Sequence, residues 1–514
     1  MQPIRLIRSA VTVGGWTLLS RGAGFARDMM MAAYLGAGPV ADAFNVAFSL
    51  PNMFRRFFAE GAFNMAFVPI FAKKLESGDD AQGFARDAFN GLAAVLIVFS
   101  VLGTLAMPWL VWAMASGFAG SERFDLAVMF GQISFSYILF ISLVALLSGA
   151  LNAYGRFTEA GFVPVLMNLM FIAAMGLAVW FGWDMGLTLA WTVPVTGIAQ
   201  LAFTWVAAHR MGLRFTPGLP RLSPDLKRLA LIAAPAVLTG GVVQVNLLVG
   251  RQVASYTEGA VSWLVYADRL YQLPLGVVAI AIGTVLLPDL SRRLRAGDAA
   301  GGRESFNRGT ELALLLTLPA AVALMVIALP LTHVLYERGA FTAADTQATA
   351  LVLAIYGAGL PAFVLHKVLQ PLFYAREDSR SPFRFALWAM VVNVVFAVGM
   401  MPLIGFSAAA LATTVAGWTM VWQLWRGSRA MGDEARFDDR LRRRLPRILA
   451  ACGVMALVLW GGSVLMAELL TAPGWRYPAL AGLIAAGMVS YGGAVLAFRA
   501  YRLSDLRAAM RRQR

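Results

Sequence analysis

Charged side chains occur inside long apolar stretches of this sequence. A charge at the centre of a bilayer costs at least about 2.5–3.5 kcal/mol, so it normally faces a partner or a water-filled cavity. Four apolar stretches carry such charges, at Arg21, Arg27, Asp28, Asp42, Arg55, Arg56, Glu60, Arg251, Asp268 and Arg269. Arginine predominates, and its planar guanidinium group suits phosphate and carboxylate oxygens. These residues therefore predict a pocket for an anionic ligand.

The spacing of polar residues follows the helical period. Steps of three or four residues connect Asp42, Asn45, Ser49, Asn52, Arg56 and Glu60, which predicts one polar stripe on a helix. Arg21 and Asp28 are seven residues apart, as are Ser262 and Arg269, so each pair shares a helix face. The pattern predicts a water-filled, arginine-rich cavity. The alternative is mutual pairing, for example of Arg27 with Asp28 or of Arg56 with Glu60.

The elements that carry these residues are predicted membrane helices. The 514 residues are 59% hydrophobic and 14% charged, with a mean hydropathy of +0.68, whereas soluble chains are about 45–50% apolar and about 25% charged. Segments of about 20 apolar residues are long enough to cross a bilayer as helices. The fold class is therefore an all-α polytopic membrane protein of about fourteen spans: 10–35, 40–72, 88–114, 127–152, 161–182, 187–208, 228–254, 262–290, 309–335, 347–374, 383–402, 405–425, 447–469 and 477–498.

The basic residues between these spans predict an orientation. Of the 43 Lys and Arg residues, only Arg123, Arg338 and Arg476 fall in one of the two alternating sets of loops. Such a bias is typical of the positive-inside rule, and it predicts that both chain ends are cytoplasmic. It also accounts for most of the net charge of +15, so we expect no nucleic-acid partner.

The second half of the chain repeats the first. The segment 72–79 (AKKLESGD) matches 291–298 (SRRLRAGD), and Tyr154-Gly-Arg156 matches Tyr374-Ala-Arg376 at nearly the same offset. A constant offset predicts two six-helix lobes of equal orientation, with a substrate site between them near the middle of the membrane. The predicted parts are an N-lobe at 1–215, a C-lobe at 216–430, and two further helices at 431–514.

Several chemistries find no support in the sequence. Cys452 is the only cysteine, and the three histidines lie far apart, so a metal site is not expected. No nucleophile motif is present, so we do not expect an enzyme. No interior charge comparable to that of the four stretches above is expected in the spans 88–114, 127–152, 161–182, 187–208, 309–335, 383–402, 405–425, 447–469 and 477–498.

Three segments together resemble a known family. Residues 20–28 (SRGAGFARD), 41–63 (which contain LPNMFRRFFAEGAF) and 261–270 (VSWLVYADRL) are similar to signatures of the MurJ/MviN lipid II flippases. This family belongs to the multidrug/oligosaccharidyl-lipid/polysaccharide exporter superfamily. The resemblance covers essentially the whole chain, including the last two helices, which distinguish MurJ from its twelve-helix relatives.

The resemblance implies a flippase that moves lipid II, the undecaprenyl-pyrophosphate-linked peptidoglycan precursor, across the bacterial inner membrane. Carried over by position, it implies substrate-binding roles for Arg21, Arg27, Asp28, Asp42, Arg55, Ser262 and Arg269. We expect supporting roles for Asn52, Arg56, Glu60, Arg251 and Asp268. The resemblance favours Arg55 over Arg56 for ligand contact, although the polar stripe favours Arg56. Members of the family often have an acidic residue at the position of Gln272 in this chain.

The resemblance also implies an apolar groove for the polyprenyl tail on the last two helices. We expect alternating access by a monomer, no cofactor, and coupling to the membrane potential or to a monovalent cation. Inside-negative potential drives an anionic head group outward, at about 2.3 kcal/mol per charge per 100 mV. The alternatives are a flippase for another polyprenyl-linked glycan, a drug/cation antiporter of the same superfamily, and a non-transporting scaffold for cell-wall assembly.

Overall fold

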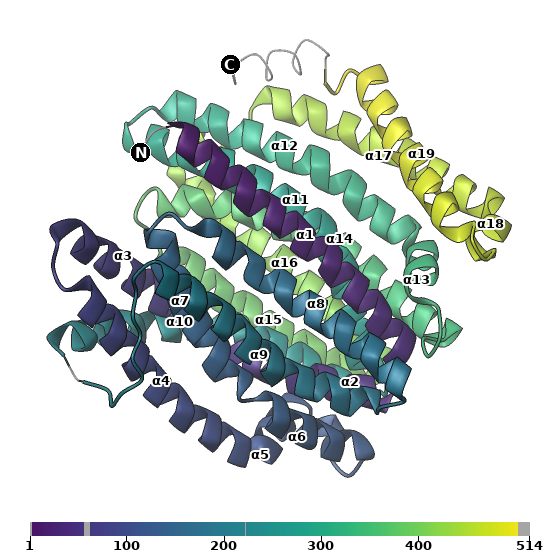
Figure 1. The fold of residues 1–514 in the computed structure, drawn as a ribbon. Coiled ribbons are helices and arrows are strands. Elements are labelled where there is room, and N and C mark those ends of the chain that lie inside the picture. The colour runs from purple at the N-terminus through teal and green to yellow at the C-terminus, as the bar shows by residue number, and fades with distance from the viewer. Residues whose placement is uncertain (1–2, 56–61, 222, 502–514) are drawn as a thin grey trace. The chain divides into compact units, whose positions relative to one another are not determined.

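The structure is a computed structural model that describes the backbone of residues 3–55, 62–221 and 223–501, and every regular element in those ranges is a helix. The helices divide by their packing into two units, one of residues 1–262 with 338–341 and one of residues 263–337 with 342–514. Figure 1 shows the ribbon. The predicted all-helical fold is confirmed for the described residues.

The first unit contains the helices up to α10. They are α1 (Pro3–Leu35), α2 (Pro39–Arg55), α3 (Ala62–Ser77), α4 (Ala81–Leu105), α5 (Met107–Met114), η2 (Ser116–Phe118), α6 (Glu122–Ser134), α7 (Tyr137–Ala153), α8 (Phe157–Phe181), α9 (Met185–Arg210) and α10 (Pro224–Ala254). Helices α1 and α8 pack side by side, and α10 packs against α3, α4 and α5.

The second unit begins within α11. Its helices are α11 (Ala260–Arg295), α12 (Ala299–Val326), α13 (Ala328–Tyr336), α14 (Ala343–Tyr374), α15 (Arg380–Ile404), α16 (Ser407–Ser428), η3 (Arg429–Met431), η4 (Asp433–Ala435), α17 (Asp439–Leu465), α18 (Ala467–Thr471) and α19 (Arg476–Ala497). Helices α17 and α19 lie against each other, and α17 also packs on α12 (Figure 1). The predicted lobe boundaries follow the sequence repeat rather than this packing, and they stay predictions.

Each predicted span corresponds to one helix or to two consecutive helices. In the part of the chain that the structure describes, nine segments are long and apolar enough to cross a membrane, which supports a multi-pass membrane protein. Helices α1, α2, α10 and α11 are not among the nine, and these are the helices that carry the charges singled out above. The total of fourteen therefore stays a prediction.

The sequence repeat has a counterpart in local structure. The Asp80 carboxylate caps α4 by accepting a bond of 2.6 Å from the Gly83 N–H, and Asp298 caps α12 through the Gly301 N–H at 2.9 Å. Gly78 and Gly297, just before these caps, both adopt positive φ values of 73° and 72°, which glycine tolerates best. The two segments, 219 residues apart by these glycines, fold alike.

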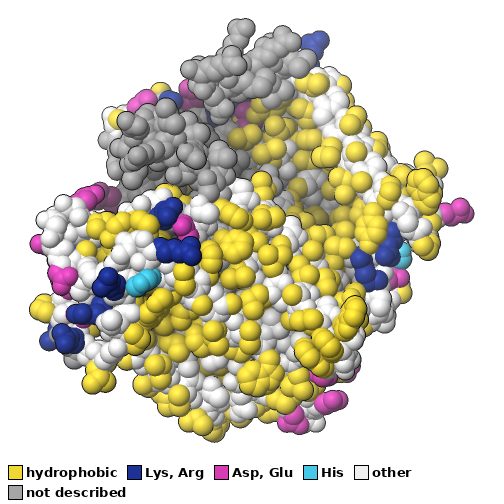
Figure 2. All heavy atoms as spheres, in the orientation of Figure 1, with side chains coloured by type: hydrophobic (Ala, Val, Ile, Leu, Met, Phe, Trp, Pro, Cys, Tyr) yellow, Lys and Arg dark blue, Asp and Glu magenta, His cyan; other side chains and the backbone are white. Residues whose placement is uncertain are grey.

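The surface is largely apolar. Figure 2 shows one face, on which hydrophobic side chains spread widely and charged side chains gather in a few small groups. Large exposed apolar side chains include Leu105, Trp109, Trp180 and Leu465. A soluble protein would expose few such groups together, whereas lipid chains cover them without cost.

Candidate functional site

Arg27 and Asp28 form a buried ion pair on α1. The Nε and Nη2 atoms of Arg27 donate to Asp28 Oδ1 at 3.1 and 2.7 Å. The two residues are only 8% and 7% exposed, and the Arg27 guanidinium carbon lies 5.6 Å from the centroid of the Phe171 ring on α8. The pairing that the sequence offered as an alternative to ligand contact is therefore present. An arginine has five N–H donors, so this pair does not exhaust the capacity of Arg27.

Asp42 lies fully buried near the start of α2 and caps another helix. Its carboxylate accepts hydrogen bonds from the Gly259 N–H at 2.8 Å, the Ser262 N–H at 3.0 Å and the Ser262 hydroxyl at 2.7 Å. Helix α11 begins at Ala260, and the first N–H groups of a helix lack partners within it. A carboxylate at this end also complements the helix dipole. Asp42 thus fixes the N-terminus of α11 against α2.

Asn45 extends the same contact by one helical turn. Its side-chain amide donates to the Ser262 hydroxyl at 3.0 Å, so that hydroxyl donates to Asp42 and accepts from Asn45. The first two residues of the polar stripe predicted on α2, Asp42 and Asn45, therefore both bind Ser262 on α11. Further along the stripe, Ser49 donates to the Asn45 carbonyl and Asn52 to the Phe48 carbonyl, both within α2.

Arg123 is a member of this network that the sequence analysis did not select. Its Nη1 atom lies 3.6 Å from Asp42 Oδ2 and donates to the Ser255 carbonyl at 3.2 Å. Its guanidinium carbon lies 4.6 Å from the centroid of the Phe118 ring. One feature of the sequence does distinguish Arg123: it is one of only three basic residues in the set of loops that otherwise contains no Lys or Arg. That feature predicts no partner, so Asp42 was not foreseeable as its neighbour.

The remaining predicted site residues occupy varied surroundings. Arg21 is exposed, and Arg55 and Arg251 are half-buried within the first unit. Asp268 and Arg269 are half-buried in the second unit, where the Gln272 amide donates to Asp268. Arg56 and Glu60 lie outside the described residues. The convergence of Arg269 with the arginines of α1 and α2 stays a prediction.

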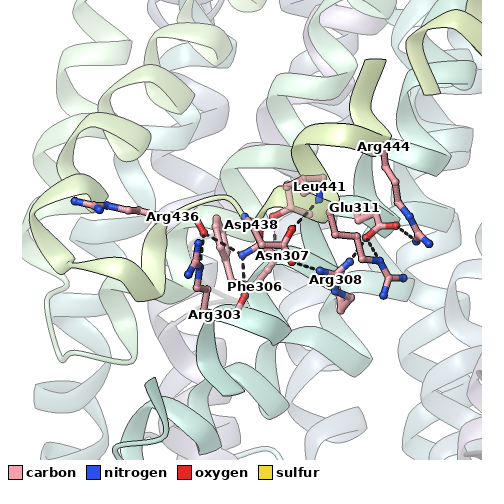
Figure 3. A network of polar contacts seen from close by, with 11 residues as sticks. Arg303, Phe306, Asn307, Arg308, Glu311, Arg436, Asp438, Leu441 and Arg444 are labelled. Carbon is pink, nitrogen blue, oxygen red and sulfur yellow. Dashed lines mark hydrogen bonds and ion pairs between the residues drawn. The ribbon is translucent and has the colours of Figure 1, made fainter. Parts of the chain in front are cut away.

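A second charged cluster surrounds Glu311 on α12, as Figure 3 shows. The Glu311 side chain is fully buried and forms ion pairs with Arg308, Arg440 and Arg444. Arg308 also pairs with Asp438, which caps α17 through the Leu441 N–H at 2.7 Å. The cluster joins α12 to the first turns of α17.

Glu311 was not singled out from the sequence, which predicted no interior charge comparable to that of the four charged stretches in the span 309–335. Glu311 lies at its start and has no access to solvent. The sequence did not reveal it because its partners Arg440 and Arg444 lie more than a hundred residues away along the chain. Among the described residues, no group of three or more His, Cys, Asp or Glu side chains is arranged to hold a metal ion.

The chain is similar over most of its length to proteins of one family. The model of the family described as "Lipid II flippase MurJ" matches residues 31–473. The chain is 46% identical over 461 residues to a probable lipid II flippase MurJ of Rhizobium tropici, covering 88% of this chain and 86% of the relative. It is 44% identical over 517 residues to the probable lipid II flippase MurJ of Rhizobium meliloti, covering 99% and 96%.

Solved structures agree with this fold. A structure described as lipid II flippase MurJ in an inward closed conformation matches with a TM-score of 0.78 at 24% identity, over 95% of this chain and 98% of that one. An inward-facing multidrug transporter of the MATE family, in the MOP superfamily, matches with a TM-score of 0.67 at 12% identity, over 80% and 94%. The family match and the near full-length relatives together show that this chain belongs to the MurJ family.

Proposed function

We propose that this protein is a lipid II flippase of the bacterial inner membrane. It would move the undecaprenyl-pyrophosphate-linked precursor from the cytoplasmic to the periplasmic leaflet by alternating access. Relatives that align over 88% and 99% of this chain are described as probable lipid II flippases MurJ. The observation that carries the proposal is Arg27, a permanent cation that is buried on α1 in a protein of this family.

Arg27 is the centre of the proposed head-group site. Asp28 binds the Nε edge of the guanidinium and fixes its plane, which prepares the other N–H groups for a pyrophosphate oxygen. Arg55 and Arg269 are the proposed further cations, and Arg21 is the proposed cation at the exposed part of α1. This arginine-rich set favours an anionic substrate over the cations of a drug antiporter.

Asp42 and Ser262 receive a different role from the one first expected. The Asp42 carboxylate is fully buried and accepts three hydrogen bonds, so we assign it to positioning α11 rather than to ligand contact. With the proposed cytoplasmic N-terminus, this junction lies at the periplasmic ends of α2 and α11. Its opening would accompany outward release of the head group.

The membrane potential is the proposed driving force. An inside-negative potential favours outward movement of an anionic head group and inward return of an empty cationic site. Collapse of the potential at constant ATP should slow lipid II flipping in cells, and an unchanged rate would reject this coupling. We further propose that the protein acts as a monomer.

The function is tested in a strain depleted of its own lipid II flippase. The wild-type chain should restore growth, and Arg27→Gln, expressed to the same level in the membrane, should not. Arg210→Gln, which removes an exposed arginine at the end of α9, is the matched control and should restore growth. Failure of the wild-type chain despite normal expression would contradict the proposed function.

A further inference from the structure

The second unit contains an apolar cavity that the proposed transport site does not use. It has a volume of about 290 Å³ and lies among α12, α14, α16 and the segment before α17. Its lining consists of Phe306, Thr310, Leu365, Leu369, Trp418, Val421, Trp422, Trp425 and Phe437. Ligand cavities usually hold about 300–1,000 Å³, so this one accommodates part of a chain rather than a whole lipid.

The wall of the cavity offers almost no polar group. Phe306 and Phe437 stack with their ring centroids 6.0 Å apart and their planes 6° from parallel. The Thr310 hydroxyl donates to the Phe306 carbonyl at 2.8 Å, and the Trp418 indole N–H donates to the Ala358 carbonyl at 3.1 Å. With these donors already bonded, the cavity favours a hydrocarbon ligand over a polar one.

Two arginines stand beside the tryptophans that line this cavity. The Arg426 guanidinium carbon lies 5.5 Å from the Trp422 ring centroid, and that of Arg429 lies 3.6 Å from the Trp425 centroid. Both arginines are exposed, and within the described part of the chain neither forms an ion pair with an acid. Stacking on an indole orients a guanidinium and leaves its N–H edge available to an oxyanion.

The cavity lies near the end of α16, where the chain changes from apolar to polar, so we expect its ligand to come from the membrane. The two arginines mark the end of α16, where the apolar helix gives way to the polar segment 429–438. Tryptophan and arginine side chains gather at such a membrane interface, and basic pockets between membrane helices bind anionic lipid head groups. Trp418 and Trp422 are 42% and 52% exposed, so lipid has access to them.

We propose that this cavity binds one acyl chain of an anionic phospholipid whose phosphate contacts Arg426 and Arg429. The apolar wall selects the chain, and the two arginines beside Trp422 and Trp425 select the negative head group. The site lies wholly in the second unit, and neither Arg27 nor Asp28 is among its lining residues. The proposal does not depend on lipid II transport.

Tryptophan quenching by brominated lipids tests the site in the full-length protein. The chain is reconstituted in phosphatidylcholine nanodiscs that contain a minor fraction of either phosphatidylglycerol or phosphatidylcholine with brominated acyl chains. Bromine quenches a tryptophan that it touches. We expect stronger quenching by brominated phosphatidylglycerol than by brominated phosphatidylcholine, and we call that difference the anionic excess. Equal quenching by the two lipids would overturn the proposal.

Variants locate the anionic excess. Trp422→Phe should reduce it, whereas the control Trp388→Phe, which removes an indole 58% exposed on α15, should leave it unchanged. The double variant Arg426→Gln/Arg429→Gln should weaken the apparent affinity for phosphatidylglycerol about tenfold, because it removes charge-assisted hydrogen bonds. Its quenching by brominated phosphatidylcholine should not change, which shows that the variant is folded. An excess that survives in the double variant would place anionic lipid elsewhere.

A competition experiment separates phospholipid from polyprenyl lipid. Unlabelled phosphatidylglycerol should relieve the anionic excess in proportion to its dilution of the brominated lipid. Undecaprenyl phosphate at the same mole fraction should relieve it no better. Stronger relief by undecaprenyl phosphate would overturn the assignment to phospholipid. This experiment measures no transport, so its failure and the failure of the proposed flippase activity are distinguishable.

Discussion

The Asp42 carboxylate accepts hydrogen bonds from both the backbone N–H and the hydroxyl of Ser262, a residue 220 positions further along the chain. With the Gly259 N–H, these bonds satisfy donors at the first turn of α11 that the helix itself cannot. A residue that sequence analysis assigned to ligand contact thus serves, in this structure, to fix one helix on another. The distinction leads to different expected phenotypes for Asp42 and Arg27.

Asp42→Ala should destabilise the protein by about 1–3 kcal/mol, because it leaves buried backbone donors without an acceptor. A lowered melting temperature of the purified protein in detergent is the expected result. Ser49→Ala is the control, since the Ser49 hydroxyl bonds only to a carbonyl of its own helix, and its melting temperature should stay near that of wild type. An unchanged melting temperature for Asp42→Ala would show that the junction contributes little.

The Arg27–Asp28 pair should separate stability from transport. Removing one partner of a buried pair costs about 3–5 kcal/mol, whereas replacing both with neutral groups of similar size costs much less. We therefore expect Arg27→Gln to lower the melting temperature and Arg27→Gln/Asp28→Asn to recover most of the loss. The double variant should still fail to support growth of a flippase-depleted strain. Restored growth would mean that the pair is structural only.

The Glu311 cluster should hold α17 on α12. Glu311→Ala would leave Arg308, Arg440 and Arg444 facing one another without their shared acid, so a lower melting temperature is expected. Arg440 is about half exposed, and its share of the effect is small because solvent screens it. Glu304→Gln, at an exposed position on the same helix, is the control. Equal melting of Glu311→Ala and wild type would exclude a stabilising role.

Glu337 should contribute to stability at neutral pH and lose its contribution in acid. Burial alone would raise its pKa, but hydrogen bonds from Thr346 and His333 and the charges of His333 and Arg476 lower the pKa below the usual 4.5. A carboxyl whose pKa is lower in the folded state stabilises that state above its unfolded pKa. The melting temperature should therefore fall as the pH drops below about 4.5. Glu337→Gln should show a smaller fall, and an identical fall would remove Glu337 as a cause.

Features that depend on the spacing or the composition of residues could be predicted from the sequence. The polar stripe on α2 predicted that Asp42 and Asn45 share a face, and both contact Ser262. The repeat predicted two similar halves, which the matching caps at Asp80 and Asp298 support. Hydropathy located the helices, since burial in lipid requires long apolar runs.

Ion pairs between residues on different helices could not be predicted from the sequence. Nothing in the sequence joins Arg123 to Asp42, or Arg444 to Glu311, because these ion pairs depend on how helices pack. Glu311 also illustrates a limit of hydropathy, since one acid at the end of an apolar span hardly changes the average. Hydropathy also did not reveal the break between α12 and α13, which lies just before Pro330, because both helices are apolar. In the other half of the chain, the break between α4 and α5 likewise lies just before a proline, Pro108.

Lipid II flipping measured in cells tests the central claim most directly. Cells that depend on this chain as their flippase are labelled in their peptidoglycan precursors, and lipid II exposed on the periplasmic side is quantified with wild type, Arg27→Gln and Arg210→Gln at matched membrane levels. We predict periplasmic lipid II for wild type and Arg210→Gln, and accumulation on the cytoplasmic side for Arg27→Gln. Equal exposure of lipid II in all three strains, or none with the wild-type chain, would contradict the account.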